Sequence, residues 1–270
     1  MLYVEYIRIL NKNDIILLNF WRIWMIIELI LVGIFIGTMS GFFGIGGGMI
    51  LVPLLLVLGF EIKDAIGISI VQMVFSSVFG SYLNHKKGSL IVGEGIFVGL
   101  GGFIGGYIGG YVTVYISDTI LHFLFFGLLL FALFRLFFSK NHEDDSQTKS
   151  LSKILLFAIG LMIGIFAITL GIGGSVILTP LLVGLLHYPI KKAVSAGLFF
   201  VAFSSVAGMV SRLNSGTIDS HNGLVVAIAS LVGVTLGIWF KDHVSSKNHK
   251  LSLLVLYVFA LGMLMKKIFF

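Results

Sequence analysis

The sequence predicts an all-α membrane protein that crosses the bilayer several times and consists of two homologous repeats. Hydrophobic residues make up 58% of the 270 residues and charged residues only 11%. A water-soluble domain of this length could not keep so many apolar side chains off its surface, and the mean hydropathy is +1.09. A glycine-rich segment, Gly44–Pro53, returns almost unchanged as Gly171–Pro180, 127 residues further on. Composition therefore predicts the membrane, and the repeated segment predicts the duplication.

Five apolar segments occur in each half, separated by short polar or charged loops. They cover residues 23–43, 48–60, 64–83, 91–116 and 118–138, and then 153–170, 175–187, 191–211, 219–240 and 250–268. A transmembrane helix needs about 20 residues, and the second segment of each half supplies only about a dozen apolar ones. Both short segments directly follow the glycines and contain a proline. We therefore expect four long transmembrane helices and one short half-helix per half, the half-helix being re-entrant or part of a broken span.

The similarity between the halves continues after the glycines when the spacing becomes 128 residues. Ile62–Ala65 then matches Ile190–Ala193, and the serine pair at 76–77 matches the pair at 204–205. A polar stretch separates the two copies and is typical of a linker. The predicted parts are an N-terminal extension or interfacial helix over 1–22, a first transmembrane repeat over 23–138, a linker over 139–152 and a second repeat over 153–270.

The number of crossings can be tested with the distribution of Lys and Arg, which favour the cytoplasmic side of a membrane. If the short segments re-enter without crossing, eight spans with the N-terminus inside place 12 of the 18 basic residues inside. If they cross, ten spans place 11 inside, with the N-terminus outside. The eight-span arrangement is slightly favoured. It makes the repeats parallel, whereas ten spans make them inverted.

The two glycine clusters are the candidate ligand-binding elements. Because glycine has no Cβ, the backbone can leave the helix there and expose its N–H groups. The half-helix that follows begins with free N–H donors and the positive end of the helix dipole, which attract anions. A helix that merely packs needs neither successive glycines nor a proline, so we favour a ligand or permeation role. The residues assigned to it are Gly44, Gly46, Gly47, Gly48 and Pro53 in the first half, and Gly171, Gly173, Gly174, Ser175 and Pro180 in the second.

Two helix ends cannot hold a dehydrated anion unaided. Each contributes about 0.3 to 1 kcal/mol, and up to about 2 kcal/mol when partly buried, whereas desolvating an unpaired ion costs several kcal/mol. The polar residues of the third segments are the expected helpers, namely Gln72, Ser76, Ser77, Ser204 and Ser205. The serines could instead bond to their own helices. Glycines at four-residue spacing, at 33, 37 and 41 and at 101, 105 and 109, are typical of close helix packing.

The sequence does not indicate a catalytic, metal or cofactor site. There is no cysteine, the seven histidines lack ligand spacing, and no nucleophile or zinc-protease motif occurs. The net charge of +6 comes from Lys and Arg at the ends of apolar segments, which suits anionic headgroups rather than nucleic acid. Cationic residues near the ends of the third segments, Lys86 and Arg212, could attract an anion or simply orient the chain. We expect no enzyme, no cofactor, no metal and no nucleic acid.

The chain resembles the TauE/SafE family of membrane transporters, which includes permeases for sulfite and organosulfur compounds. The resemblance rests on the element G-x-G-G-G-x4-P at Gly44–Pro53 and on its second occurrence at Gly171–Pro180, and covers about Trp24 to Phe270. Ser175 departs from the pattern because it replaces the third glycine. The resemblance implies transport of small anions, often sulfur-containing, across the cell membrane, typically a bacterial inner membrane.

The leading hypothesis is a secondary transporter in which the two glycine breaks face each other and form one anion site between the repeats. Sulfite or a sulfonate is the expected class of substrate. An anion channel that uses the same helix ends without alternating access is the alternative. The expected partners are a small anion and the lipid bilayer, and self-association into a homo-oligomer stays open.

Overall fold

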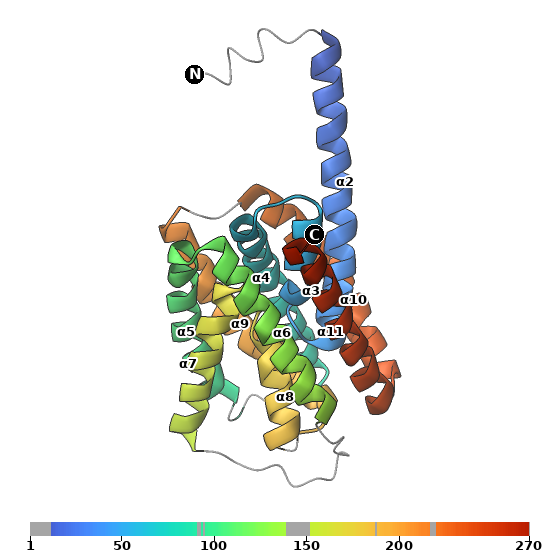
Figure 1. Ribbon diagram of the computed structural model, residues 1–270. Helices are drawn as coiled ribbons and strands as arrows, with labels where there is room; N and C mark the ends of the chain where they lie inside the picture. The colour runs from blue at the N-terminus through green and yellow to red at the C-terminus, as the bar shows by residue number, and fades with distance from the viewer. Residues whose placement is uncertain are drawn as a thin grey trace.

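The computed structural model describes residues 12–90, 93, 95–138, 152–186, 188–216 and 220–269, and in these residues it contains helices and no strand (Figure 1). The helices are α2 (Lys12–Phe43), α3 (Gly48–Val57), α4 (Ile62–Lys86), α5 (Gly95–Tyr115), α6 (Asp118–Phe138), α7 (Lys153–Thr169), α8 (Ser175–Leu185), α9 (Ile190–Asn214), α10 (Ser220–His243) and α11 (Ser246–Phe269). Seven of them are long and apolar enough to cross a membrane; the shorter ones are α3, α7 and α8. The prediction of an all-α, multi-pass membrane protein is confirmed.

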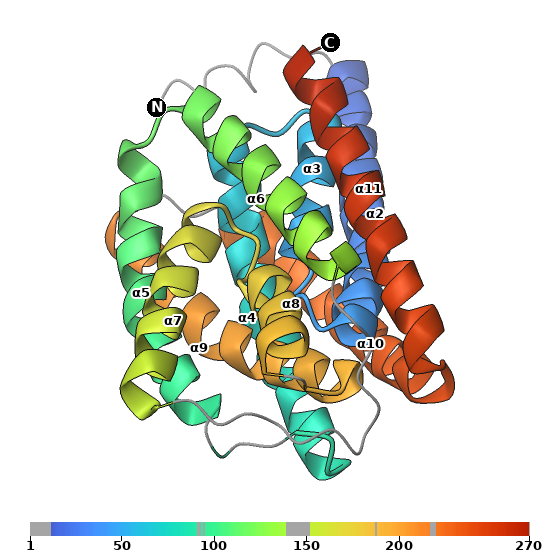
Figure 2. The same cartoon turned by 60° about the horizontal axis from the view of Figure 1, so that its bottom comes forward.

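The centre of the bundle is formed by α4 and α9, which are the most buried of the candidate spans. These two helices hold equivalent places in the two halves of the sequence. Arg212, near the end of α9, donates a hydrogen bond to the carbonyl oxygen of Lys63 at the start of α4. Ser195, near the start of α9, lies 3.4 Å from Ser89, which follows α4. Therefore α4 and α9 run antiparallel, as Figure 2 also shows.

Antiparallel α4 and α9 mean that the two halves are inverted relative to each other. This differs from the favoured eight-span arrangement, which implied parallel repeats, and matches the orientation of the alternative. The charge count separated the two arrangements by a single residue, so it carried little information. The physical reason for the inversion is the number of crossings in each half. The first helix enters, the short helix (α3 or α8) returns to the side of entry, and three complete spans follow, so each half crosses the membrane an odd number of times.

Helix pairing follows the same pattern in both halves. α2 packs on α10 and α7 packs on α5, while α10 also packs on α4 and α5 on α9. The glycines at four-residue spacing make the first two contacts close. A Cβ on Gly37 would lie 2.1 Å from the carbonyl oxygen of Ser230, and a Cβ on Gly105 would lie 2.1 Å from that of Leu161. The close-packing role predicted for these glycines is thus confirmed.

The short helices α3 and α8 begin in the interior and return to the side from which α2 and α7 entered (Figures 1 and 2). Gly44 lies against Val194, one turn into α9, whereas Gly47 lies against Gln72 in the middle of α4. The chain therefore turns back at the glycines and α3 runs outward from mid-depth. Both short helices have the re-entrant form.

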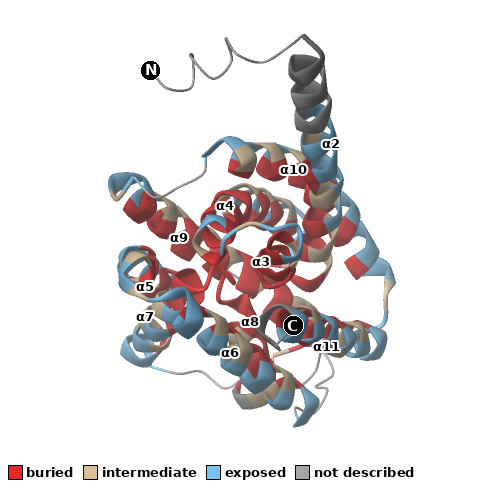
Figure 3. Ribbon diagram, turned by 45° about the horizontal axis from the view of Figure 1, so that its top comes forward, coloured by how far each residue is buried: buried red, intermediate tan, exposed pale blue. Residues whose placement is uncertain are grey.

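An outer ring of helices with exposed apolar faces surrounds a centre of buried residues (Figure 3). In α5 and α6 the outward positions include Tyr107, Phe123 and Phe131, which suit contact with lipid. At the N-terminus, α2 begins at Lys12, so residues 12–22 continue the first transmembrane helix. Residues 1–11, which are half of the predicted extension, and residues 139–151, which are nearly all of the predicted linker, lie outside the described part of the chain.

Candidate functional site

Both glycine clusters break the chain by adopting left-handed backbone conformations. Gly47 has a φ of 92° and Gly174 a φ of 73°, and each stands immediately before the first residue of a half-helix. Residues with a Cβ rarely adopt such angles. Positive φ angles are found at Gly44, Gly46 and Gly47, and again at Gly171, Gly173 and Gly174. The repeated sequence therefore encodes a repeated sharp turn.

The two breaks contact each other in the interior. A Cβ on Gly48 would lie 1.9 Å from the carbonyl oxygen of Gly171, and one on Gly173 would lie 3.2 Å from that of Ile45. Met73 and Val201, one from each central helix, both lie against Gly46 of the first break and Gly173 of the second. The structure thus brings together the two glycine segments that the sequence singled out, and it does so between the halves.

The N-terminus of α3 has donors that the protein leaves open. The N–H groups of Ile50 and Leu51 both bond to the carbonyl oxygen of Gly47. Among the described residues, no acceptor is recorded for the N–H groups of Gly48 and Met49. Free N–H groups and the helix dipole together give this point a partial positive charge.

Gln72 of α4 is a polar side chain that lies beside this helix end. Its Oε1 and Nε2 would lie 2.8 and 3.1 Å from a Cβ on Gly47. The side chain is completely buried, and neither polar atom has a hydrogen-bond partner. A buried amide without partners costs about 1 to 3 kcal/mol for each unsatisfied group. Such a residue is expected where a ligand completes its hydrogen bonds.

The equivalent place at the second break is apolar. Phe200 stands where Gln72 stands in the first half, and its ring carbon Cε1 would lie 2.3 Å from a Cβ on Gly174. The unpartnered hydroxyls on α8 beside this break are those of Ser175 and Thr179. The two breaks are therefore similar in backbone and different in side chains.

The departure at Ser175 is matched by an exchange on the neighbouring helix. In the first half, Gly48 begins α3 and Ser69 of α4 donates to the carbonyl oxygen of Gly171. In the second half, Ser175 begins α8 and Gly197 of α9 faces it, so that a Cβ on Gly197 would lie 2.8 Å from the Cβ of Ser175. In each half, one serine and one glycine occupy the first position of the short helix and the facing position of the central helix. The order is exchanged between the halves, because these positions are so close that only one of them can carry a side chain.

Some of the remaining predicted residues contact a glycine break, and others bond to their own helix. Ser76 donates to the carbonyl oxygen of Gly46 and so touches the first break. Ser77 and Ser204 donate to carbonyl groups of their own helices, which is the alternative considered for them. Ser205 is buried with an unpartnered hydroxyl. The prolines, Pro53 and Pro180, lie inside α3 and α8.

Sequence reasoning missed the buried cation Lys241, because the segment around it looks like a loop that follows an apolar run. Lys241 and Arg212 are each 1% exposed, whereas no Asp or Glu is buried among the described residues. The ion pairs in this part of the chain, Lys63–Asp118 and Lys87–Asp242, involve partly exposed side chains. The fixed charges that are buried among the described residues are therefore positive, which favours anions over cations in the interior.

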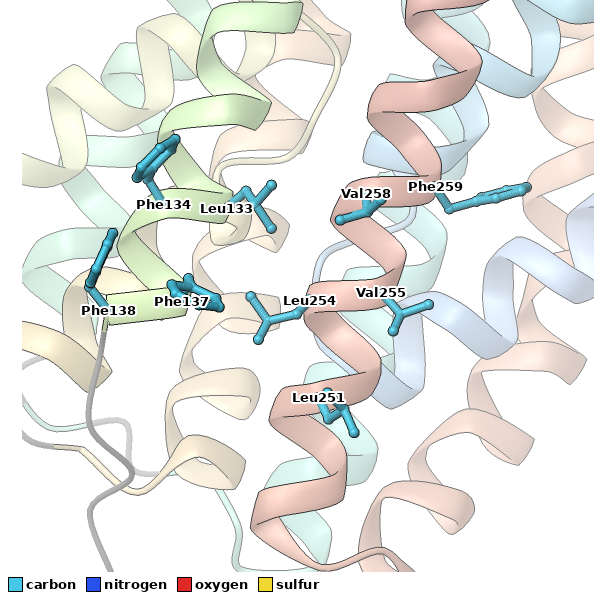
Figure 4. Close-up of a pocket in the computed structure, with 9 residues that line it drawn as sticks. All are labelled: Leu133, Phe134, Phe137, Phe138, Leu251, Leu254, Val255, Val258 and Phe259. Atoms are coloured by element: carbon cyan, nitrogen blue, oxygen red, sulfur yellow. The ribbon is translucent and has the colours of Figure 1, made fainter.

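An apolar groove of about 720 Å³ lies between α6 and α11 on the outside of the bundle (Figure 4). Its lining consists of Leu, Val and Phe side chains such as Phe134, Phe137 and Leu254. Such a surface suits lipid acyl chains and offers nothing to an anion. No cluster of three metal-ligating side chains occurs among the described residues.

Comparison with known proteins identifies the family of the chain. The profile described as Sulfite exporter TauE/SafE matches residues 29–265, which is most of the chain. The chain belongs to the TauE/SafE family. The predicted membership is thereby confirmed, and the match includes both glycine breaks and all of the helices except the first part of α2 and the last residues of α11.

Relatives of similar sequence occur in archaea and bacteria. A probable membrane transporter protein of Methanocaldococcus jannaschii is 26% identical over 256 residues, which cover 88% of this chain and 95% of the relative. The probable membrane transporter protein YdhB of Bacillus subtilis is 27% identical over 219 residues, covering 79% and 89%. YunE of the same organism is 25% identical over 250 residues, covering 82% and 90%. No solved structure shows a significant match to the chain. This TauE/SafE protein is therefore a multi-pass membrane transporter.

Proposed function

We propose that this TauE/SafE protein is a secondary transporter of a small oxyanion, with sulfite or a sulfonate as the substrate class. The observation that carries the proposal is the buried amide of Gln72, which has no partner and lies beside the open N-terminus of α3. The free N–H groups of Gly48 and Met49 would bind one part of the anion, and the Nε2 of Gln72 another.

The chemistry of the interior supports an anion rather than a cation. A sulfite or sulfonate group presents three oxygen atoms and needs several donors. The helix dipole supplies a favourable potential of up to about 2 kcal/mol in a partly buried site, and the donors supply the rest. Nearby carboxylates would oppose an anion, and none is buried in the described part of the chain.

The asymmetry of the two breaks suggests how access could alternate. Next to Phe200, a small cavity is lined by residues of α5, α7, α8 and α9, among them Val98, Leu156 and Leu182. The ring of Phe200 lies between this cavity and Gly174. We infer that Phe200 closes the path on the α8 side while the anion is held at α3, and that rocking of one half against the other moves the ring away.

The orientation follows from the basic residues. The end of the bundle at which α4 and α10 finish and α9 and α11 begin carries the lysines at 86, 87, 191, 192, 241, 247 and 250. With Arg135 near the end of α6 and Lys153 at the start of α7, this end holds nine of the described basic residues. The opposite end holds six, namely Lys12, Arg22, Lys63, Arg212, Lys266 and Lys267. By the positive-inside rule, the lysine-rich end is cytoplasmic.

Flux measurements in proteoliposomes test this function. Purified protein is reconstituted and exposed to labelled sulfite, sulfate and methanesulfonate, with and without a pH gradient. The proposal expects saturable flux of at least one of these anions. Unitary conductance steps in a planar bilayer would indicate the channel alternative instead, and no flux of any of the three anions would overturn the proposal.

A further inference from the structure

A buried ammonium group lies at the lysine-rich end of the bundle and bridges three helices. Lys241, in the last turn of α10, donates a hydrogen bond of 2.6 Å to the Oδ1 of Asn84 in α4. It donates a second one, of 3.1 Å, to the Oγ of Ser195 in α9. Its side chain is 1% exposed, and both partners are fully buried. Both acceptors are neutral, so the carboxylate of Asp242 acts on this charge only through space, against the like charges of Lys87 and Lys191.

No carboxylate compensates this charge directly. The ion pairs formed by the described residues join Lys63 to Asp118 and Lys87 to Asp242, and neither includes Lys241. Asp242 follows Lys241 in the sequence, but its carboxylate lies 2.6 Å from Lys87. Burying an ion without a counter-ion costs several kcal/mol. An anion bound beside the ammonium group would offset that cost.

Donors for such an anion are present. An ammonium group has three N–H donors, and two of those of Lys241 are used by Asn84 and Ser195. The Nδ2 of Asn84 is buried and has no partner. One charged donor on Lys241 and one neutral donor on the amide that it contacts therefore remain open on neighbouring groups. This combination is what an oxyanion requires.

The cluster connects the protein surface with the first glycine break. Ser89, which is half-buried, lies 3.1 Å from the Oδ1 of Asn84 and 3.4 Å from the Oγ of Ser195. Ser195 also lies beside the start of the break, because the carbonyl oxygen of Val194 would lie 2.4 Å from a Cβ on Gly44 and the carbonyl oxygen of Gly44 would lie 3.2 Å from a Cβ on Gly197. The cluster thus stands at the lysine-rich end, beside the start of the first break.

We propose that Lys241 and the Nδ2 of Asn84 bind a small oxyanion at a second site, on the cytoplasmic side of the glycine breaks. The identity of the anion as the transported substrate rests on the proposed function, whereas binding itself does not. The same chemistry would also suit the phosphate of an anionic lipid. The position of the ammonium group, enclosed by three helices, favours a small free anion over a headgroup.

Binding of sulfite to the purified protein tests the proposal. Titration calorimetry is performed in a neutral detergent and in nanodiscs of phosphatidylcholine with and without phosphatidylglycerol. The informative variant is Asn84→Asp, which has the same shape and gives Lys241 a permanent carboxylate partner. The variant keeps the contact between α4 and α10, but its carboxylate neutralises the ammonium group of Lys241. Lys241→Met removes the charge, and Lys247→Met, an exposed cation at the same end, is the matched control.

Asn84→Asp and Lys241→Met should each weaken sulfite binding at this site by about tenfold or more, the loss of one charge-assisted hydrogen bond, and Lys247→Met should bind as the wild type does. The melting temperature of Asn84→Asp without anion should equal or exceed that of the wild type, because the new ion pair replaces the missing counter-ion. Unchanged sulfite binding in Asn84→Asp would show that Lys241 is only a structural bridge. Sulfite binding that is lost when phosphatidylglycerol is present would show that a lipid phosphate occupies the site, and would also overturn the proposal.

These outcomes can be told apart from failure of the proposed function. If the protein transports none of the anions, the proposed function fails, yet binding that depends on Asn84 and Lys241 is still measured by calorimetry. If transport occurs and sulfite binding is insensitive to both variants, the second site fails and the transport function stands.

Discussion

Replacing Gln72 by leucine should change transport and stability in opposite directions. Leucine has a similar volume and keeps the contact with Gly47, but it removes the amide. In the wild-type protein without ligand, both polar atoms of Gln72 are buried without a partner, and each such group costs about 1 to 3 kcal/mol. The empty variant should therefore be more stable than the empty wild type, with a higher melting temperature.

The bound state should respond with the opposite sign. A hydrogen bond to a charged ligand is worth about 1.5 to 3 kcal/mol, which corresponds to a loss of about 10- to 150-fold in affinity. We expect the KM for sulfite in proteoliposomes to rise by this factor in Gln72→Leu. Ser77→Ala, which removes a hydroxyl that bonds only to its own helix, is the control and should transport normally.

The combination of results is what tests the reasoning. A structural role for Gln72 predicts that both the melting temperature and transport fall. A site role predicts that the melting temperature rises and transport falls. A variant with the KM of the wild type, measured at equal amounts of protein in the membrane, would refute the assignment of Gln72 to the site.

Three further predictions follow from the geometry of the breaks. Gly47→Leu and Gly174→Leu should each abolish transport while the protein still reaches the membrane. A Cβ would lie 2.6 Å from Ile36 at the first position and 2.3 Å from Phe200 at the second. The control is Gly59→Ala, at a glycine with a positive φ but open space around it, and it should transport normally in the same flux assay. Phe200→Leu should raise the passive leak of labelled sulfite from loaded vesicles, since the smaller side chain covers Gly174 less completely, and a leak equal to that of the wild type would argue against closure by this ring. Ser69→Ala should lower the melting temperature with transport retained, because the lost bond to Gly171 is worth about 0.6 to 2 kcal/mol in a membrane protein; a loss of flux at unchanged melting temperature would contradict this supporting role.

Much of the fold could be predicted from sequence because hydrophobicity and glycine repeat along the chain itself. The two half-helices were evident from the short apolar segments that begin at Gly48 and Ser175, although the sequence left open whether they re-enter or cross. The close helix contacts were evident from the glycine spacing. The inversion of the halves was not predictable in the same way. It depends on how far α3 and α8 penetrate, and the lysine and arginine count barely distinguishes the alternatives.

The candidate site was predictable only in its backbone. Glycines that permit a left-handed turn leave a clear pattern, so the contact between Gly48 and Gly171 could be anticipated as two breaks facing each other. The difference between Gln72 and Phe200 becomes meaningful only when both are seen to cover a glycine. Lys241 was missed because burial of a charge near a helix end arises from tertiary packing, which a linear pattern does not contain.

Counterflow of labelled sulfite in proteoliposomes tests the central claim, that this protein carries a small oxyanion through one site by alternating access. Vesicles are loaded with unlabelled sulfite and diluted into a trace of labelled sulfite. The account predicts a transient accumulation of label above its equilibrium level, which Gln72→Leu diminishes at the same trace concentration. Entry of label without such an overshoot would indicate a channel, and no entry of sulfite, sulfate or methanesulfonate would contradict the account.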